Sequence, residues 1–424
     1  MTLALFEDAI CQDLKKILSA DIALEQPSSP DLGDFAFPCF QLSKQLKKNP
    51  AQIAQDIAKE FPVGEWVEKV EAKGPYVNFF INKRTLARET LTAVQKQQEK
   101  YGSTADGKGK NIVIDFSHPN IAKPFGIGHL RSTMIGGSLY KIFNHLGYKS
   151  IGVNHLGDWG TQFGKLITAY KMWGDQKKLE DAPIKHLFDL YVQFHTEAEI
   201  RPELDDDARA WFLKLERGDK DALKLWELFR EVSLEEFQKL YKMLEIHFDT
   251  WDGESFYNDK MEATIAECKK KKLTQTSEGA LIIPMDGLGR TDVPPLMLAK
   301  KDEASTYATR DLAAAQYRLK TYKPEQVIYV VGTPQKLHFE QVFHALSLLG
   351  LPAEKFVHVD FGHMNFPEGK MQTRKGNIIF LEEVLHQAIE RAMKIIEEKN
   401  PDLENKKDVA QMIGIGAVDR KSVV

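Results

Sequence analysis

A polar loop between two apolar segments carries the first side chains that could do chemistry. It reads FSHPNIAKPFGIGHLRST (residues 116–133) and includes Asn120, Lys123 and His129. The β-branched run 112–116 predicts a buried strand before the loop, and apolar residues at helical spacing predict a helix after it. Glycines let a ligand approach the backbone, and a helix N-terminus offers N–H groups to a phosphate. The loop therefore suits a nucleotide, although an ordinary strand–helix connection would have the same form.

A second candidate is a basic, glycine-containing loop, KMQTRKGN (residues 370–377), ahead of an expected helix over 381–399. Its cations Lys370, Arg374 and Lys375 would suit a pyrophosphate leaving group, because charge develops there mainly in the transition state. Taken alone, the loop could equally be a basic surface turn.

Further polar residues lie where expected strands end, which is where ligands bind in open parallel sheets. GDWGTQFG follows the strand 150–154, and GTPQ, which ends in Gln335, follows the strand 327–331. A helix opening at Ser305 or Thr306, either of which could cap it, places Tyr307 and Asp311 four residues apart. They therefore share one face.

These groups need a scaffold, and the chain predicts a parallel α/β one. The strand 112–116, the helix 128–146 and the strand 150–154 form a β-α-β unit, which is right-handed and parallel. The segment from about 172 to 276 is highly charged with apolar residues at helical spacing, so it predicts a helical insertion between two halves of a nucleotide-binding fold.

Residues 1–105 predict a separate small α+β domain. Its first helix ends near residue 19, with an apolar face of Leu3, Phe6, Ile10, Leu14 and Ile17. A second helix begins at Asn49-Pro50, with Asn49 as the N-cap. A strand over 76–82 presents Val77, Phe79 and Ile81 on one face and Tyr76, Asn78, Phe80 and Asn82 on the other. Aromatic rings and amides suit unpaired bases, but a half-exposed sheet with a polar outer face has the same pattern.

Composition sets the class of protein. The 424 residues are 43% hydrophobic and 28% charged, which is typical of a soluble globular protein of two or three domains. The run of about 18 apolar residues needed for a membrane span does not occur. The three widely spaced cysteines predict neither disulfides nor a zinc site, and favour a reducing cytoplasm. The net charge of −4 argues slightly against nucleic acid, but an RNA-binding surface can be local.

The loop GIGH (126–129), together with HLGDWGTQFGKL (155–166), resembles the HIGH region of class I aminoacyl-tRNA synthetases, and most nearly that of arginyl-tRNA synthetases. KMQTR resembles their second signature, KMSKS, and the resemblance continues through most of the chain. Two positions depart from the family pattern. Gly126 stands in place of the first histidine, and Arg374 in place of the second lysine.

The resemblance implies a fold: a Rossmann-like parallel-sheet catalytic domain of class I synthetases with a helical insertion, plus an N-terminal α+β domain. The implied boundaries are 1–105 for an N-terminal domain touching the tRNA D-loop, 106–171 and 291–365 for the catalytic halves, 172–290 for the insertion, 366–400 for the KMSKS-like loop and its helix, and 401–424 for the start of a shortened anticodon-binding domain.

The resemblance also implies an activity, that of an arginine–tRNA ligase. Arginine and ATP give arginyl-adenylate, and the arginyl group passes to the 3′ end of arginine tRNA, with tRNA needed for the first step. Mg²⁺ would arrive with ATP. No structural zinc and no membrane contact are expected, and the protein is expected to be a cytoplasmic monomer.

Site residues follow from matching positions in the family. The implied catalytic residues are Lys123, His129, Lys370, Arg374 and Lys375, with Lys123 supplying the charge of the missing KMSKS lysine. The implied ATP-binding residues are Gly126, Gly128, His129, Phe361, Gly362, His363 and Met364. The implied arginine-binding residues are Asp115, Asn120, Glu254, Tyr307, Asp311 and Gln335. The implied tRNA-binding residues are Tyr76, Asn78, Phe80 and Asn82; no metal ligand is implied.

Two other functions stay open at this point. A small-molecule nucleotidyltransferase of the same fold would lack the insertion, the N-terminal domain and the acids suited to a guanidinium. A catalytically inactive, synthetase-like RNA-binding protein is favoured only by the loss of the first HIGH histidine at Gly126.

Overall fold

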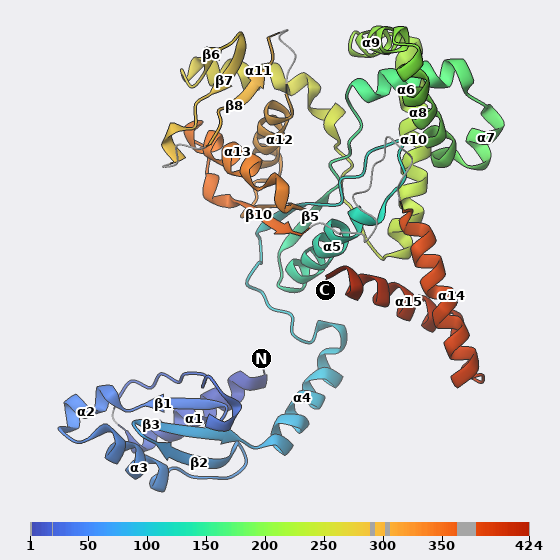
Figure 1. Cartoon of the computed structure of the whole chain (residues 1–424). Helices are drawn as coiled ribbons and strands as arrows, with labels where there is room; N and C mark the ends of the chain where they lie inside the picture. The colour runs from blue at the N-terminus through green and yellow to red at the C-terminus, as the bar shows by residue number, and fades with distance from the viewer. Residues whose placement is uncertain (1, 19, 289–292, 302–305, 363–378, 424) are drawn as a thin grey trace. The chain divides into compact units, whose positions relative to one another are not determined.

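The computed structural model describes residues 2–18, 20–288, 293–301, 306–362 and 379–423. The chain divides into two compact units, Met1–Thr104 and Ala105–Val424, each of which is described by itself (Figure 1). The architecture is mixed α/β with a parallel sheet in the second unit, as the sequence predicts.

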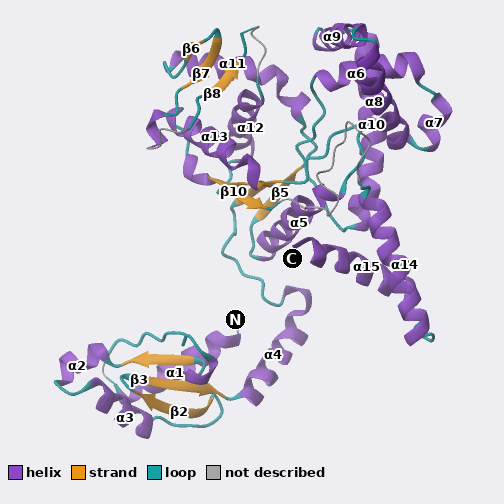
Figure 2. Ribbon diagram, in the orientation of Figure 1, coloured by secondary structure: helices purple, strands orange, loops and turns teal. Residues whose placement is uncertain are grey.

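The first unit is a three-stranded antiparallel sheet with helices. Its elements are α1 (Thr2–Ile17), β1 (Phe35–Pro38), α2 (Phe40–Leu46), α3 (Pro50–Glu60), β2 (Val67–Lys73), β3 (Tyr76–Ile81) and α4 (Lys83–Gln97). The strand order is β1-β3-β2 (Figure 2). The predicted cap of α3 is confirmed, because Asn49 Oδ1 accepts a hydrogen bond from Ala51 N–H at 2.9 Å.

Two details of this unit differ from the prediction. Helix α1 ends at Ile17, and Leu3 is exposed, so the buried face consists of Phe6, Ile10 and Leu14. Strand β3 ends at Ile81, and Asn82 is the N-cap of α4 rather than part of the sheet face. The first N–H groups of a helix have no partner within the helix, and an asparagine side chain can accept their hydrogen bonds. This capping favours ending the strand before Asn82 over extending it through that residue.

A four-stranded parallel sheet forms the centre of the second unit. Its strands are β4 (Asn111–Asp115), β5 (Lys149–Val153), β9 (Gln326–Gly332) and β10 (Phe356–Phe361), in the order β10-β9-β4-β5. All neighbours are parallel, and Asp115 pairs in register with Val153 on one side and Tyr329 on the other. The carboxyl ends of three strands therefore meet at one edge, as predicted.

Helices cover both faces of this sheet. Helix α5 (Leu130–His145) covers the face that carries Ile112 and Ile114, while α12 (Tyr307–Tyr322) and α13 (Lys336–Leu348) pack on the side of Val113. Alternate residues of β4 thus enter two different cores, as expected for a strand buried on both faces.

The connection between the sheet halves is mostly helical. It contains α6 (Thr161–Trp173), α7 (Gln176–Asp181), α8 (Pro183–Ile200), α9 (Glu203–Glu216), α10 (Lys220–Met243) and α11 (Asn258–Lys270). A small antiparallel sheet of β6 (Gln275–Ser277), β7 (Ala280–Ile283) and β8 (Leu296–Ala299) follows, which the sequence did not predict.

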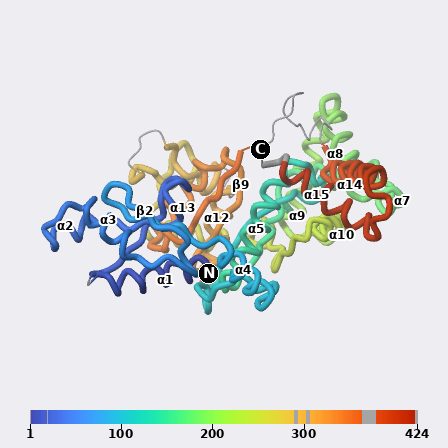
Figure 3. The backbone as a smooth tube through the Cα atoms, turned by 90° about the horizontal axis from the view of Figure 1, so that it is seen from below, coloured from blue at the N-terminus to red at the C-terminus, as the bar shows by residue number. Residues whose placement is uncertain are grey.

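Helices α14 (Leu381–Lys399) and α15 (Lys406–Val423) end the chain and lie side by side (Figures 1 and 3). The bounds of α14 match the prediction. At the start of α12, Thr306 occupies the N-cap position without capping through its side chain, because its hydroxyl instead donates to the Met297 carbonyl. Ser305 lies outside the described residues.

Candidate functional site

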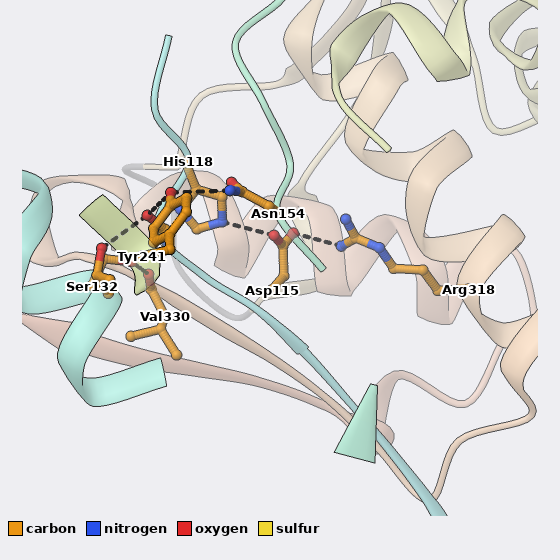
Figure 4. Close-up of polar contacts among 9 residues, drawn as sticks. Asp115, His118, Ser132, Asn154, Tyr241, Arg318 and Val330 are labelled. Atoms are coloured by element: carbon orange, nitrogen blue, oxygen red, sulfur yellow. Dashed lines mark hydrogen bonds and ion pairs between the residues drawn. The ribbon is translucent and has the colours of Figure 1, made fainter. Parts of the chain in front are cut away.

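The loop after β4 begins with a buried hydroxyl network. Ser117 N–H donates to Ser132 Oγ at 2.9 Å, and that hydroxyl donates to the Val330 carbonyl at 2.6 Å. Ser117 Oγ lies 2.6 Å from the hydroxyl of Tyr241, which accepts a hydrogen bond from Asn154 Nδ2 at 3.0 Å (Figure 4). Residues of β9, α5 and α10 thus fix where the loop leaves the sheet.

The backbone there is strained. Ser117 and His118 have φ values of 79° and 55°, in the left-handed region that non-glycine residues rarely adopt. The hydroxyl network holds this conformation, and it turns the His118 ring back onto Asp115, with Nε2 2.8 Å from Oδ1. Strain of this kind concentrates at functional sites.

The loops after β4 and β5 are joined by backbone hydrogen bonds. Ile121 N–H donates to the Gly157 carbonyl at 3.2 Å, and Gly157 N–H donates to the Pro119 carbonyl at 3.0 Å. A Cβ atom on Gly157 would lie 2.3 Å from Asn120 Oδ1, so only glycine fits against this asparagine. Asn120 is thereby held at the carboxyl edge of the sheet.

Gly126 is the N-cap of η3 (Ile127–His129), a turn that contains His129 and the exposed Gly128. His129 Nδ1–H donates to the Gly126 carbonyl at 3.2 Å, and the ring packs on Phe125. Burial lowers the pKa of His129 to about 4, so the imidazole is neutral at physiological pH. With Nδ1 carrying the proton, Nε2 is left as a hydrogen-bond acceptor.

The end of the second signature loop is anchored on this turn. Gly126 forms an antiparallel bridge with Phe380, and Ile127 N–H donates to the Ile379 carbonyl at 3.1 Å. Leu381 N–H closes the contact on the Phe125 carbonyl at 3.0 Å. The residues predicted for the loop itself and for the strand end before it, namely His363, Met364, Lys370, Arg374 and Lys375, lie outside the described residues.

Lys123 is held by two helices of the connection between the sheet halves. Its Nζ donates to Gln162 Oε1 on α6 at 2.7 Å and lies 5.0 Å from the ring centroid of Tyr191 on α8. A cation over an aromatic face is favourable. Gln162 belongs to GDWGTQFG, and the sequence alone did not assign it this position.

Asp115 lies in a buried ion pair at the end of β4. Its Oδ2 is 2.7 Å from Arg318 Nη1, and the two residues are only 3% and 1% exposed (Figure 4). Burial would raise the pKa of Asp115, but Arg318 and His118 outweigh it and hold that pKa well below its usual range. A carboxylate offers about four lone-pair sites, so these contacts leave acceptor capacity for an ammonium group.

Three of the residues implied to bind arginine, Glu254, Tyr307 and Asp311, lie within electrostatic range of one another. Glu254 is in η4 (Glu254–Tyr257). Partial burial raises the pKa of Tyr307, and the charge of Glu254 adds to this shift. Asp311 Oδ2 lies 2.6 Å from His338 Nε2. Burial, opposed by Arg310 and reinforced by Asp158 and Asp311, raises the pKa of Glu254 to about 7. Tyr307 is 67% exposed, and the guanidinium carbon of Arg310 lies 6.0 Å from its ring centroid.

Asp158 positions Glu254 and was missed from the sequence. It is fully buried and accepts hydrogen bonds from Ser255 N–H and Ser255 Oγ, both at 2.8 Å, and from Arg230 Nε at 3.3 Å. A Cβ atom on Gly253 would lie 2.6 Å from Asp158 Oδ1, so glycine is needed beside it. The signal was an acid inside an otherwise apolar and glycine-rich stretch.

Arg318 was also missed. It follows Leu312 and Ala315 at spacings of three, so a charged residue continues an apolar stripe of α12. Such a residue is buried only when it has a partner.

The ends of β9 and β10 are joined by Thr333 Oγ1, which donates to the Phe361 carbonyl at 3.0 Å. Arg131 Nη1 donates to the Gly362 carbonyl, and Gln335 is exposed.

The four residues predicted to bind tRNA have different surroundings. Asn78 is 4% exposed and, with Tyr76, lines a cavity of about 410 Å³ in the first unit. Phe80 lies under Lys69 Nζ, which is 4.7 Å from its ring centroid. Asn82 Oδ1 accepts from the N–H groups of residues 84 and 85, so its side chain is used as a helix cap.

The described residues contain no group of three or more His, Cys, Asp or Glu side chains arranged to hold a metal ion. Within the same residues, every helix is too short or too polar to cross a membrane.

Comparison with known proteins identifies the family. The model for the class I tRNA synthetase (R) catalytic domain matches residues 90–423, and that for the arginyl tRNA synthetase N terminal domain matches residues 4–81. The chain is 52% identical over 396 residues to an arginine–tRNA ligase of Clostridium perfringens, covering 93% of this chain and 69% of that protein. It is 48% identical over 419 residues to one of Clostridium beijerinckii, covering 97% and 74%.

Solved structures show the same fold. The arginyl-tRNA synthetase of Thermus thermophilus superposes with a TM-score of 0.72 at 23% identity, covering 99% of this chain and 74% of that one. The enzyme of Plasmodium falciparum gives 0.69 at 24% identity, covering 98% and 72%. A parallel sheet whose carboxyl edge carries the first signature loop, and relatives this similar over nearly the whole chain, place the protein in the arginyl-tRNA synthetase family.

Proposed function

We propose that this family member activates arginine with ATP and passes the arginyl group to the 3′ end of arginine tRNA. One observation carries the proposal: Lys123, His129, Asp115, Glu254 and Asp311 lie around the carboxyl ends of β4, β5 and β9. Carboxylates there suit a dicationic amino acid, and the lysine and helix N-terminus suit phosphates.

For arginine, we propose that Asp115 receives the α-ammonium group and that Asn120 and Gln335 hold the backbone. Glu254 and Asp311 would pair with the guanidinium, with Tyr307 against its plane. A planar guanidinium favours carboxylates and flat aromatic partners, which supports this assignment. Asp158 and Arg318 act indirectly, by fixing Glu254 and Asp115 respectively.

For ATP, we propose binding along Gly126, Gly128, His129, Phe361, Gly362, His363 and Met364. The neutral His129 would accept a hydrogen bond at Nε2 from a donor on ATP. Lys123, Lys370, Arg374 and Lys375 would stabilise the charge that develops on the departing pyrophosphate. Mg²⁺ would accompany the phosphates and keep several of its waters.

The enzyme needs no covalent nucleophile for this reaction. The arginine carboxylate attacks the α-phosphorus while pyrophosphate leaves, so catalysis consists of positioning the reactants and stabilising charge.

We propose Tyr76, Asn78, Phe80 and Asn82 as the tRNA-contacting residues of an N-terminal domain over 1–105. We also propose a cytoplasmic monomer, with catalytic halves at 106–171 and 291–365, an insertion at 172–290, the second signature loop and its helix at 366–400, and a C-terminal segment at 401–424.

The test is arginine-dependent ATP–pyrophosphate exchange in the presence of arginine tRNA, followed by charging of that tRNA. Exchange with arginine and not with lysine or citrulline is expected. Binding of arginine tRNA without exchange would instead indicate a catalytically inactive RNA-binding protein, the alternative favoured by Gly126. If no amino acid supported exchange and another small-molecule acceptor did, both the ligase and the inactive RNA-binding protein would be contradicted.

A further inference from the structure

An arginine side chain of the protein itself lies within the pocket proposed to bind the guanidinium of the substrate. Arg310, on the first turn of α12, has Nη1 3.6 Å from Glu254 Oε2, and the two side chains are 11% and 16% exposed. Its Nη2 donates to Asn258 Oδ1 at 3.2 Å, and its guanidinium carbon lies 6.0 Å from the Tyr307 ring centroid. Among the described residues, its buried Nε has no hydrogen-bond partner.

Arg310 lies between acids from two separate elements. Glu254 is on η4, while Glu216 ends α9 of the insertion. Burial raises the pKa of Glu216, and the charge of Arg310 opposes that shift, so this guanidinium is within electrostatic range of both carboxylates. Its helix also carries Tyr307 and Asp311, so its position is fixed relative to the rest of the pocket.

The charges that surround Glu254 are mixed. Asp158, after β5, and Asp311, on α12, disfavour its ionisation; Arg310 and Lys123, from the loop after β4, favour it. Lys123 is held by Gln162 and Tyr191, and Asp158 by Ser255 and Arg230. Arg310 forms an ion pair with Glu254, with Nη1 3.6 Å from Oε2.

We propose that Arg310 is a positioning residue that fixes the Glu254 carboxylate and favours its ionised form, so that the pocket prefers a cationic side chain over a neutral one. This inference rests on the proposed function of Glu254. Without the neighbouring guanidinium, a carboxyl group in this buried place takes up a proton at neutral pH, and it then loses its preference for guanidinium over a neutral urea group.

The consequence is a specific pH dependence. The pKa of Glu254 is about 7, so arginine affinity should fall as the pH drops below 7. Arg310→Gln removes a favourable charge and moves this midpoint to higher pH. Each unit of displacement weakens arginine binding about tenfold at a pH below both midpoints. At pH 8.5, where Glu254 regains its charge, most of the affinity should return.

The experiment is calorimetric titration of the full chain with arginine and with citrulline from pH 6 to 8.5. Arg310→Gln should shift the midpoint of arginine affinity upward and reduce the preference for arginine over citrulline at pH 7. Arg310→Lys, which keeps the charge, should restore the midpoint. Arg217→Gln, the same substitution at an exposed position on the α9 end, is the matched control and should resemble wild type.

The outcomes separate the two proposals. If wild type binds no arginine at any pH, the proposed pocket fails. If wild type binds arginine and Arg310→Gln keeps the same midpoint, only the role of Arg310 is overturned. Tighter arginine binding by Arg310→Gln would also overturn it, because Arg310 would then compete with the substrate for Glu254. A merely structural role would weaken binding equally at every pH and in both Arg310 variants.

Discussion

Replacing Arg318 by methionine should destabilise the unit Ala105–Val424 by about 3–5 kcal/mol at pH 7. Methionine fills much of the apolar volume, so the loss comes mainly from charge. The substitution leaves Asp115 only 3% exposed, at the end of a central strand, with His118 as its remaining partner. An uncompensated buried carboxylate costs far more than the ion pair contributes.

Urea unfolding followed by tryptophan fluorescence measures this loss, because five of the six tryptophans lie in this unit. With a urea slope of about 3 kcal/mol per M, the midpoint should fall by about 1–1.7 M. Arg318→Lys should lose less of the free energy of unfolding, because it keeps a positive charge near Asp115, although it lacks the planar guanidinium group.

The loss should also depend on pH. In wild type, the depressed pKa of Asp115 contributes stability that is present above its unfolded pKa of about 3.9 and is lost as the pH falls further. In Arg318→Met, burial raises the pKa of Asp115 instead, so the variant becomes less stable as the pH rises from about 4 to 7. The difference from wild type should therefore be smaller at pH 4.5 than at pH 7.

A double-mutant cycle with Asp115→Asn completes the test. Each single variant leaves one buried charge alone, whereas the double variant leaves none, so its loss should be well below the sum of the two. A loss under 1 kcal/mol in Arg318→Met, or additive losses in the cycle, would refute the claim that this pair is buried and coupled.

Three further outcomes are expected. Asp311→Asn should raise the arginine KM by the equivalent of about 2–5 kcal/mol and weaken rejection of citrulline in steady-state kinetics. Asp207→Asn, on an exposed helix face, should leave both unchanged, and an unchanged KM in Asp311→Asn would contradict its role. Lys123→Ala should lower the rate of adenylate formation far more than ATP affinity, and the exposed Lys141→Ala should change neither; a normal rate in single-turnover kinetics would move the role to the cations of the second signature loop. Pyrophosphate exchange should depend on arginine tRNA, and combining Asn78→Ala with Phe80→Ala should blunt that dependence; vigorous exchange without tRNA would contradict the coupling.

Local signals in the sequence predicted much of the scaffold. Asn49-Pro50 marks a helix start by its own chemistry, and the β-branched runs of β4 and β9 mark strands buried on both faces. The strand ends then follow, because parallel strands share one carboxyl edge. The sheet of β6 to β8 was not predictable, since its strands are three or four residues long and β6 is exposed.

The residues that hold the site in place could not be predicted in the same way. Lys123 meets Gln162 across 39 residues, and Asp158 meets Ser255 across 97. No helical or strand period relates such partners, so only the folded chain brings them together. What the sequence did contain was the anomaly of Arg318 in an apolar stripe, which demands a partner without naming it.

The most direct test of the central claim is ATP–pyrophosphate exchange with each of the twenty amino acids in the presence of arginine tRNA. We expect exchange with arginine and with none of the other nineteen amino acids. This exchange should be abolished or strongly reduced in Asp311→Asn and Lys123→Ala, and retained in Asp207→Asn and Lys141→Ala. Exchange with a different amino acid, or exchange with arginine that survives both site substitutions unchanged, would contradict the account.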